Sequence, residues 1–141
     1  MPPLFCLMKK ILIVEDEKIL AEMYRDVFTR EGFDVHSAFT EKEALELAAT
    51  GKPDLILLDI LLPEANGISF LKEKNKRPAI ASIPVIAFSN FDDIETKREA
   101  FQLGVQDYLI KTNYTPQQIV SRVNEYVQKI ETEESRSKSE T

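Results

Sequence analysis

Acidic, hydroxyl and amino side chains stand in this sequence directly after short apolar runs. Glu15 and Asp16 follow the first run, Asp59 the third, Ser89 the fourth and Lys111 the fifth. Three carboxylates brought together repel one another and favour a hard divalent cation such as Mg²⁺, which accepts carboxylate, water and phosphate oxygens as ligands. A lysine and a hydroxyl beside them could hold a phosphoryl group. The combination predicts a site for phosphoryl transfer to a carboxylate.

Each of these residues, taken alone, has an ordinary structural explanation. A carboxylate after a buried strand is often the N-cap of the next helix, and Asp16 or Glu17 could cap the helix that follows. A hydroxyl at a strand end and a solvated lysine are also common. The prediction therefore depends on all five groups meeting, which requires the apolar runs to be strands of one sheet.

The apolar runs have the properties of such strands. Residues 11–14, 55–58, 85–88 and 108–110 are short and apolar and contain β-branched residues, which is typical of strands covered on both faces. The mixed segment 33–38 suits an edge strand.

Helical segments follow each of these runs. Apolar residues between positions 19 and 28 lie on one helical stripe, and Gly32 ends it. The remaining helices have recognisable starts: Thr40 with Glu43 as a capping box, Gly67, Asp92 with Glu95, and Thr115 with Pro116 and Gln118.

Five alternating strands and helices with short connections predict a doubly wound α/β fold. Right-handed crossovers give a five-stranded parallel sheet of strand order 2-1-3-4-5. Such sheets bind ligands at the carboxyl ends of their strands. That edge is where the five chemically active side chains would meet.

Length and composition restrict the class of protein. The 141 residues suffice for one domain, and the formal net charge of −6 argues against direct binding to nucleic acid or to an anionic membrane. The single Cys6 indicates a reducing compartment, and no apolar run approaches the roughly 18 residues of a membrane span. We expect a disordered leader over 1–7, the domain over 8–130 and a disordered, highly charged tail over 131–141.

Four blocks of the sequence resemble the signature blocks of response-regulator receiver domains in two-component signalling. They are residues 11–17, 55–67, 84–90 and 108–111, and Asp59 is followed by Pro63 and Gly67 as in the phosphorylation loop of that family. The resemblance covers about residues 9–130. It implies a single domain with the flavodoxin-like (βα)5 fold.

The resemblance also implies roles for the acidic residues. Asp59 would be the nucleophile that becomes an acyl phosphate. Asp16 would bind Mg²⁺ directly, Glu15 would act through water, and the backbone carbonyl of Leu61 would complete the protein ligands together with Asp59.

The remaining matching residues would bind the phosphoryl group and transmit its effect. Ser89, Asn90 and Lys111 would contact the phosphoryl group, and Tyr108 would be an aromatic switch that turns into space vacated by Ser89.

Two positions depart from the family. Thr112 replaces the proline that usually follows the lysine, so the Lys111–Thr112 peptide would be either trans or a costly non-proline cis bond. Asn90 replaces a small residue and would either crowd the phosphate or donate to it.

The function implied is that of a cytoplasmic signalling module and not of an enzyme, apart from assisting its own phosphorylation and dephosphorylation. A histidine kinase or phosphotransfer protein would supply the phosphoryl group. A downstream protein or a second copy would bind the face formed by the fourth helix, fifth strand and fifth helix, without direct contact to nucleic acid or membrane.

Three other functions compete with this one. A phosphatase of the haloacid-dehalogenase type needs a second aspartate two residues after the nucleophile, where this chain has Leu61. A flavodoxin-type carrier needs a Ser/Thr/Gly-rich loop after its first strand, where Glu15, Asp16 and Glu17 would repel the flavin phosphate. A pseudo-receiver that binds partners without phosphorylation remains open, although the complete acidic site argues against it.

Overall fold

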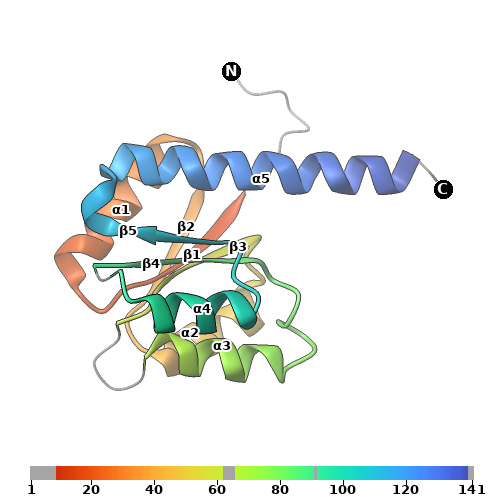
Figure 1. Cartoon of the computed structure of the whole chain (residues 1–141). Helices are drawn as coiled ribbons and strands as arrows, with labels where there is room; N and C mark the ends of the chain where they lie inside the picture. The colour runs from red at the N-terminus through yellow and green to blue at the C-terminus, as the bar shows by residue number, and fades with distance from the viewer. Residues whose placement is uncertain (1–8, 62–65, 91, 140–141) are drawn as a thin grey trace.

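Five strands alternate with five helices along the chain (Figure 1). The computed structural model describes residues 9–61, 66–90 and 92–139, with side chains described as far as Ile130. The strands are β1 (Lys10–Val14), β2 (Asp34–Ala38), β3 (Leu55–Asp59), β4 (Val85–Ser89) and β5 (Asp107–Ile110). The helices are α1 (Lys18–Arg30), α2 (Glu41–Gly51), α3 (Gly67–Asn75), α4 (Ile94–Gln102), the 3₁₀ turn η1 (Lys111–Asn113) and α5 (Pro116–Ser139).

All strand pairs in the sheet are parallel, and the order is β2-β1-β3-β4-β5. This confirms the predicted fold class and strand order. The three strands β1, β3 and β4 lie inside the sheet, and the residues of β3 and β4 are all buried. Their continuous apolar sequences follow from this position, because helices cover both faces.

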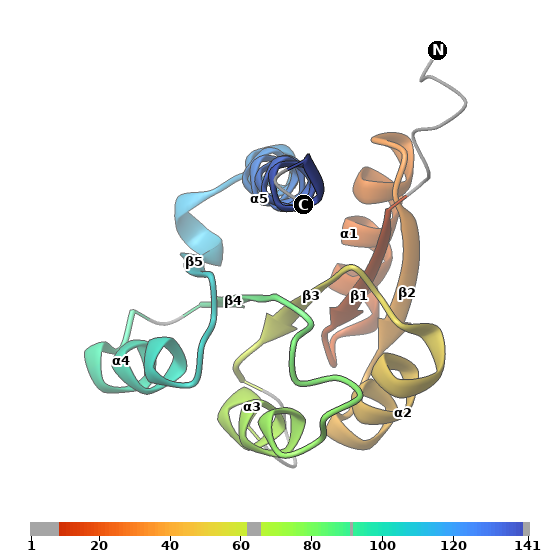
Figure 2. The same ribbon diagram turned by 90° about the vertical axis from the view of Figure 1, so that its right-hand side faces the viewer.

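Two layers of helices enclose the sheet (Figure 2). Helices α1 and α5 cover one face, where Tyr24 and Phe28 pack with Ile119 and Val123. Helices α2, α3 and α4 cover the other face with the apolar residues Ala44, Leu45, Ala48, Ile68, Phe70, Leu71 and Ala100. Each layer removes one apolar surface of the sheet from water, which is the main stabilising contribution to such a fold.

Two helix starts predicted from the sequence are confirmed in atomic detail. The Thr40 hydroxyl accepts a hydrogen bond from the Glu43 backbone N–H at 3.2 Å, before α2. Before α5, Thr115 and Gln118 bond reciprocally, with the Thr115 N–H donating to Gln118 at 2.8 Å and the Gln118 N–H donating to Thr115 at 3.1 Å. The Thr115–Gln118 pair is a complete capping box, whereas the Thr40 hydroxyl supplies the N-cap half of one, and each satisfies backbone donors that the first helical turn leaves free.

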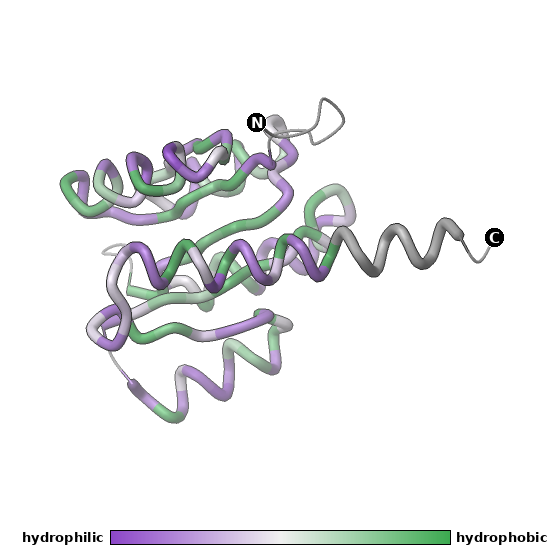
Figure 3. The backbone as a smooth tube through the Cα atoms, turned by 90° about the horizontal axis from the view of Figure 1, so that it is seen from above, coloured by the Kyte–Doolittle hydropathy of each residue, from purple (hydrophilic) through white to green (hydrophobic). Residues whose placement is uncertain are grey.

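Helix α5 is longer than the sequence predicted. It continues to Ser139, whereas the last apolar position of its predicted stripe is Ile130. The disordered tail expected over 131–141 stays a prediction. An existing helix extends without a new nucleation step, and the Glu, Lys and Arg residues of this segment have good helix propensity. Figure 3 shows hydrophilic and hydrophobic residues alternating along α5 as far as the grey segment.

No helix within the described ranges is long and apolar enough to cross a membrane. The leader 1–7 lies outside the described residues.

Candidate functional site

The predicted site residues meet at the carboxyl edge of the sheet. Asp59 is the last residue of β3, and Glu15 and Asp16 directly follow β1. Carboxylate oxygens of these three residues lie within 4.8 Å of one another. This donor set fits Mg²⁺, which takes one or two carboxylates together with water and phosphate oxygens. The parallel neighbours β1 and β3 therefore place the acidic cluster as the sequence predicted.

Lys111 reaches the same cluster from the end of β5. Its Nζ donates to Glu15 Oε2 at 2.7 Å and to Asp59 Oδ2 at 3.2 Å. The three side chains are almost fully buried, with exposed fractions of 8% for Lys111, 2% for Glu15 and 5% for Asp59. One ammonium thus bridges two carboxylates in a site with little access to water, where charge interactions are strong.

Burial changes the acid–base properties of this cluster. It raises the pKa of Glu15 from 4.5 to about 7, because its effect exceeds the opposing hydrogen bond from Lys111, and the charge of Asp59 adds to the rise. Burial alone would lower the pKa of Lys111, but the charges of Asp59 and Glu15 outweigh it and raise that pKa. Lys111 is therefore a permanent cation, whereas Glu15 can gain or lose a proton near neutral pH.

The chain after β3 fixes the position of Asp59. The Leu61 backbone N–H donates to Asp59 Oδ1 at 3.0 Å, and the Gly67 N–H donates to the Ile60 carbonyl at 2.7 Å. A Cβ atom on Gly67 would lie 2.9 Å from Ile60 Cα and 3.0 Å from the Asp59 carbonyl oxygen. Glycine is therefore required for the start of α3 to approach Asp59 this closely.

Ser89 and Tyr108 form a pair beside the acidic cluster. Ser89 ends β4 and is 1% exposed, and Tyr108 in β5 is 5% exposed. Burial raises the pKa of the Tyr108 phenol, and a hydrogen bond with the Ser89 side chain partly offsets that rise. The ring already lies in a buried position beside Ser89. The switch role of Tyr108, in which the ring turns into space vacated by Ser89, stays a prediction.

The other predicted residues occupy the rim of the site. The side chains of Asn90 and Leu61 are exposed. The Lys111–Thr112 peptide is trans, because no cis peptide bond occurs among the described residues, and η1 begins directly at Lys111. Pro63 lies outside the described residues. The ligand role of the Leu61 carbonyl and the phosphoryl-binding role of Asn90 remain predictions.

Two aromatic residues near Lys111 were missed by the sequence analysis. The Lys111 Nζ lies 4.5 Å from the centre of the Phe88 ring, and the Tyr24 ring packs edge-on against Phe88 with centroids 5.4 Å apart. The sequence pattern predicts only a buried strand position for Phe88 and a place in the apolar stripe of the first helix for Tyr24. No local sequence signal shows that a ring faces a lysine that follows the neighbouring strand.

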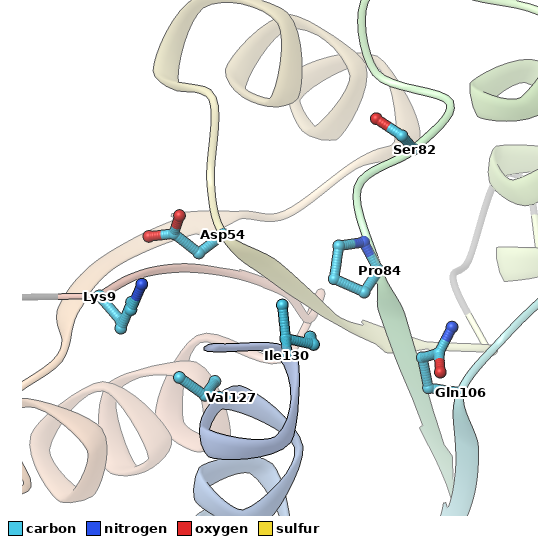
Figure 4. Close-up of a pocket in the computed structure, with 7 residues that line it drawn as sticks. All are labelled: Lys9, Asp54, Ser82, Pro84, Gln106, Val127 and Ile130. Carbon is cyan, nitrogen blue, oxygen red and sulfur yellow. The ribbon is translucent and has the colours of Figure 1, made fainter. Parts of the chain in front are cut away.

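A separate cavity lies at the opposite edge of the sheet (Figure 4). It has a volume of about 300 Å³, and Lys9, Asp54, Pro84 and Gln106 line it just before β1, β3, β4 and β5, with Val127 and Ile130 of α5. These positions are at the amino ends of the strands. The cavity is therefore remote from the acidic cluster, which lies at the carboxyl ends.

Comparison with known proteins identifies the family. The sequence pattern of the response regulator receiver domain matches residues 11–124, with the acidic cluster and Lys111 inside the match. The chain belongs to this family. It is a receiver domain of the two-component response-regulator type, a class that interacts with kinases and phosphotransfer proteins.

Curated relatives are longer proteins that contain such a domain. The chain is 33% identical over 123 residues to the alkaline phosphatase synthesis transcriptional regulatory protein PhoP of Bacillus subtilis, covering 87% of this chain and 50% of the relative. It is 39% identical over 102 residues to the regulatory protein AtoC of Escherichia coli, covering 72% of this chain and 22% of the relative. The receiver domain thus spans half or less of these relatives.

Solved receiver structures have the same fold. A putative response regulator from Chloroflexus aurantiacus is 31% identical, with a TM-score of 0.78, and the alignment covers 86% of this chain and 99% of that one. A CheY-like receiver domain protein from Methanospirillum hungatei is 26% identical, with a TM-score of 0.82 and coverages of 90% and 99%. The agreement extends over almost the whole length of both structures.

Proposed function

We propose that this receiver domain accepts a phosphoryl group on Asp59 in the presence of Mg²⁺ and then alters its interaction surface. A cytoplasmic histidine kinase or phosphotransfer protein would be the donor. The observation that carries the proposal is the convergence of Glu15, Asp16 and Asp59, with carboxylate oxygens within 4.8 Å, beneath the buried ammonium of Lys111. A set of carboxylates with one fixed cation is suited to hold a divalent ion and a phosphoryl group together.

The transfer itself needs only the carboxylate of Asp59 as a nucleophile. One of its oxygens attacks the phosphorus of the donor phosphohistidine, a new O–P bond forms, and the P–N bond breaks with its electron pair remaining on the imidazole nitrogen. Bound Mg²⁺ would supply charge neutralisation for the phosphoryl oxygens. Asp16, Glu15, Asp59 and the backbone carbonyl of Leu61 are the groups that would hold it.

Lys111 and Ser89 would then stabilise the product. The Lys111 ammonium already contacts Asp59 Oδ2 at 3.2 Å, so it lies next to the carboxylate that would carry the phosphoryl group. Ser89 ends the neighbouring strand, and its hydroxyl could donate to a phosphoryl oxygen by exchanging its hydrogen bond with Tyr108 for this one. The exposed Asn90 amide would add a further donor.

The signal would leave the site through Tyr108. A change in the hydrogen bonding of Ser89 acts directly on this buried phenol, which lies in β5 between α4 and α5. The face formed by α4, β5 and α5 would consequently change its preferred arrangement. A downstream protein or a second copy of the domain would bind there.

The decisive experiment is phosphorylation by acetyl phosphate with Mg²⁺, followed by mass spectrometry of the intact protein. Wild type should gain one phosphoryl group that hydroxylamine removes, and Asp59→Asn should gain none because an amide is not a nucleophile at this site. Asp26→Asn is the matched control, since Asp26 is exposed on α1. Undiminished labelling of Asp59→Asn would refute the assignment. An unlabelled wild type would favour a pseudo-receiver.

A further inference from the structure

The buried Lys111 has an aromatic partner in addition to its two carboxylates. Its Nζ lies 4.5 Å from the centre of the Phe88 ring, within the distance at which a cation is attracted to the negative face of the ring. Phe88 is fully buried, so water does not compete for this contact. Phe88 precedes Ser89 in β4, which lies between β3, the strand that ends at Asp59, and β5, the strand that Lys111 directly follows.

Tyr24 holds the Phe88 ring in this orientation. The two rings pack edge to face, with centroids 5.4 Å apart and an interplanar angle of 78°. Tyr24 projects from α1, is 4% exposed, and has a pKa raised above its usual value by burial. The phenol therefore stays neutral, and its ring restricts the rotation of Phe88 without adding a charge that would compete for Lys111.

The aromatic contact differs from the two ion pairs in one respect. Glu15 and Asp59 are the same carboxylates that would hold the divalent ion, so an ion that binds them weakens their hold on Lys111. The Phe88 ring has no atom that coordinates such an ion. Among these described partners, Phe88 is the one whose attraction for Lys111 persists when a divalent ion and a phosphoryl group occupy the site.

From this geometry we propose that Phe88 is a positioning residue for Lys111, and that Tyr24 fixes its ring. The ring keeps the ammonium at the edge of the acidic cluster while the carboxylates exchange it for a divalent ion and a phosphoryl group. This inference rests on the proposed phosphoacceptor function and deepens it. It assigns a role in the phosphoryl site to an apolar residue.

The first test varies the electrostatics of the ring without changing its shape. Phe88 is replaced by phenylalanine analogues with one, two and three fluorine atoms, which progressively weaken the attraction of the ring face for a cation. Beryllofluoride serves as the phosphoryl mimic, with Mg²⁺ present. Affinity for the mimic should fall stepwise, by roughly threefold to thirtyfold across the series.

Phe28 provides a matched control for that series. It is also fully buried against the same face of the sheet and also makes an edge-to-face contact, with Phe33 at 5.4 Å, but no contact with Lys111 is among its interactions. The same fluorinated series at Phe28 should leave the affinity for beryllofluoride unchanged. A flat response at Phe88, or equal responses at Phe88 and Phe28, would overturn the proposal.

A second readout separates this inference from the proposed function. Protons of the Lys111 side chain lie over the ring, so their NMR signals should be shifted upfield, and Phe88→Leu should remove that shift. The signals are assigned by their absence in Lys111→Arg. The upfield shift should persist with Mg²⁺ alone and with Mg²⁺ and beryllofluoride. Loss of the upfield shift when either is bound would overturn the positioning role of Phe88. A wild-type protein that takes neither phosphoryl group nor mimic would refute the proposed function, and the Mg²⁺ spectrum would still decide the role of Phe88.

Discussion

Glu15 is bound by Lys111 in this structure and is also a candidate ligand for a divalent cation. Its Oε2 accepts from the ammonium at 2.7 Å, and its oxygens belong to the cluster within 4.8 Å of Asp16 and Asp59. The two partners compete for one carboxylate. Asp16 has no such competitor among its described contacts and is only partly buried. The two acidic residues should therefore contribute differently to metal binding.

Substitution of these two residues tests that difference. Asp16→Asn should weaken Mg²⁺ affinity by roughly tenfold or more, because it removes a direct ligand. Glu15→Gln should have the smaller effect, since its contact would pass through water and its loss frees Lys111. Mg²⁺-dependent thermal stabilisation at several metal concentrations reports both affinities. Equal losses in the two variants would contradict the division of roles, and phosphorylation that survives a chelator would exclude the metal.

The raised pKa of Glu15 predicts a pH dependence of stability in the absence of metal. Between pH 4.5 and about 7 the folded state retains a proton on Glu15 that the unfolded state has lost. Stability therefore decreases as pH rises through this window and levels off above it, where both states are ionised. Urea unfolding of wild type and Glu15→Gln from pH 4.5 to 8 measures this, and the variant should show a shallower slope. Parallel curves would show that Glu15 is not the group responsible.

At the scale of elements, the contact between the end of β3 and the start of α3 determines how Asp59 is presented. The Gly67 backbone lies against Ile60 and the Asp59 carbonyl, at a distance that leaves no room for a side chain. The strand and the helix are therefore coupled at the residue that would carry the phosphoryl group. A displacement of α3 would move Asp59 relative to Lys111.

Gly67→Ala should thus affect both stability and phosphorylation. The added methyl group forces the backbone apart, at a cost of about 1–3 kcal/mol in the free energy of unfolding, and it should slow labelling of Asp59. Gly51→Ala is the matched control, because a Cβ there meets nothing within 4 Å. That change in helix α2 should be neutral or stabilising by up to about 1 kcal/mol. Urea unfolding and the rate of labelling by acetyl phosphate measure the two effects, and similar behaviour of the two variants would disprove the close-contact argument.

At the scale of the whole molecule, the site and the α4-β5-α5 face are connected through one strand. β5 carries Tyr108, which bonds Ser89, and it is followed by Lys111, which bonds Glu15 and Asp59. Both contacts would respond to a phosphoryl group added at Asp59. The strand would therefore give the proposed phosphorylation two routes to the surface, and a difference of about 1.4 kcal/mol between two arrangements is enough for a tenfold change in their ratio.

Hydrogen exchange should detect this coupling. Beryllofluoride with Mg²⁺ should change protection within residues 89–126, while β2 and α2, on the far side of the sheet, keep their protection. Lys111→Ala should still be labelled at Asp59 to some extent but should lose most of the change, because the cation that responds to the added charge is gone. Unchanged protection over 89–126 in wild type would refute the switch, even if Asp59 is phosphorylated.

The sequence alone was sufficient for the fold class, the strand order and the gathering of the acidic cluster. Short apolar runs followed by capped helices allow essentially one arrangement of five parallel strands, and that arrangement places Glu15, Asp59, Ser89 and Lys111 at one edge. These conclusions depend on periodicity and chain connectivity, which are properties of the sequence itself. The length of α5 was not predictable in this way, because charged residues with good helix propensity are compatible with both disorder and helix extension.

Only the tertiary structure determines which residues each side chain of the site contacts. Lys111 takes Glu15 as well as Asp59, Tyr108 is already buried against Ser89, and the Phe88 ring lies beneath the ammonium. Each of these contacts joins residues that lie in, or directly follow, different strands. Their geometry depends on the twist of the sheet, on the rotamers allowed by packing and on the charges that burial brings together, and none of these is encoded in the spacing of residues along the chain.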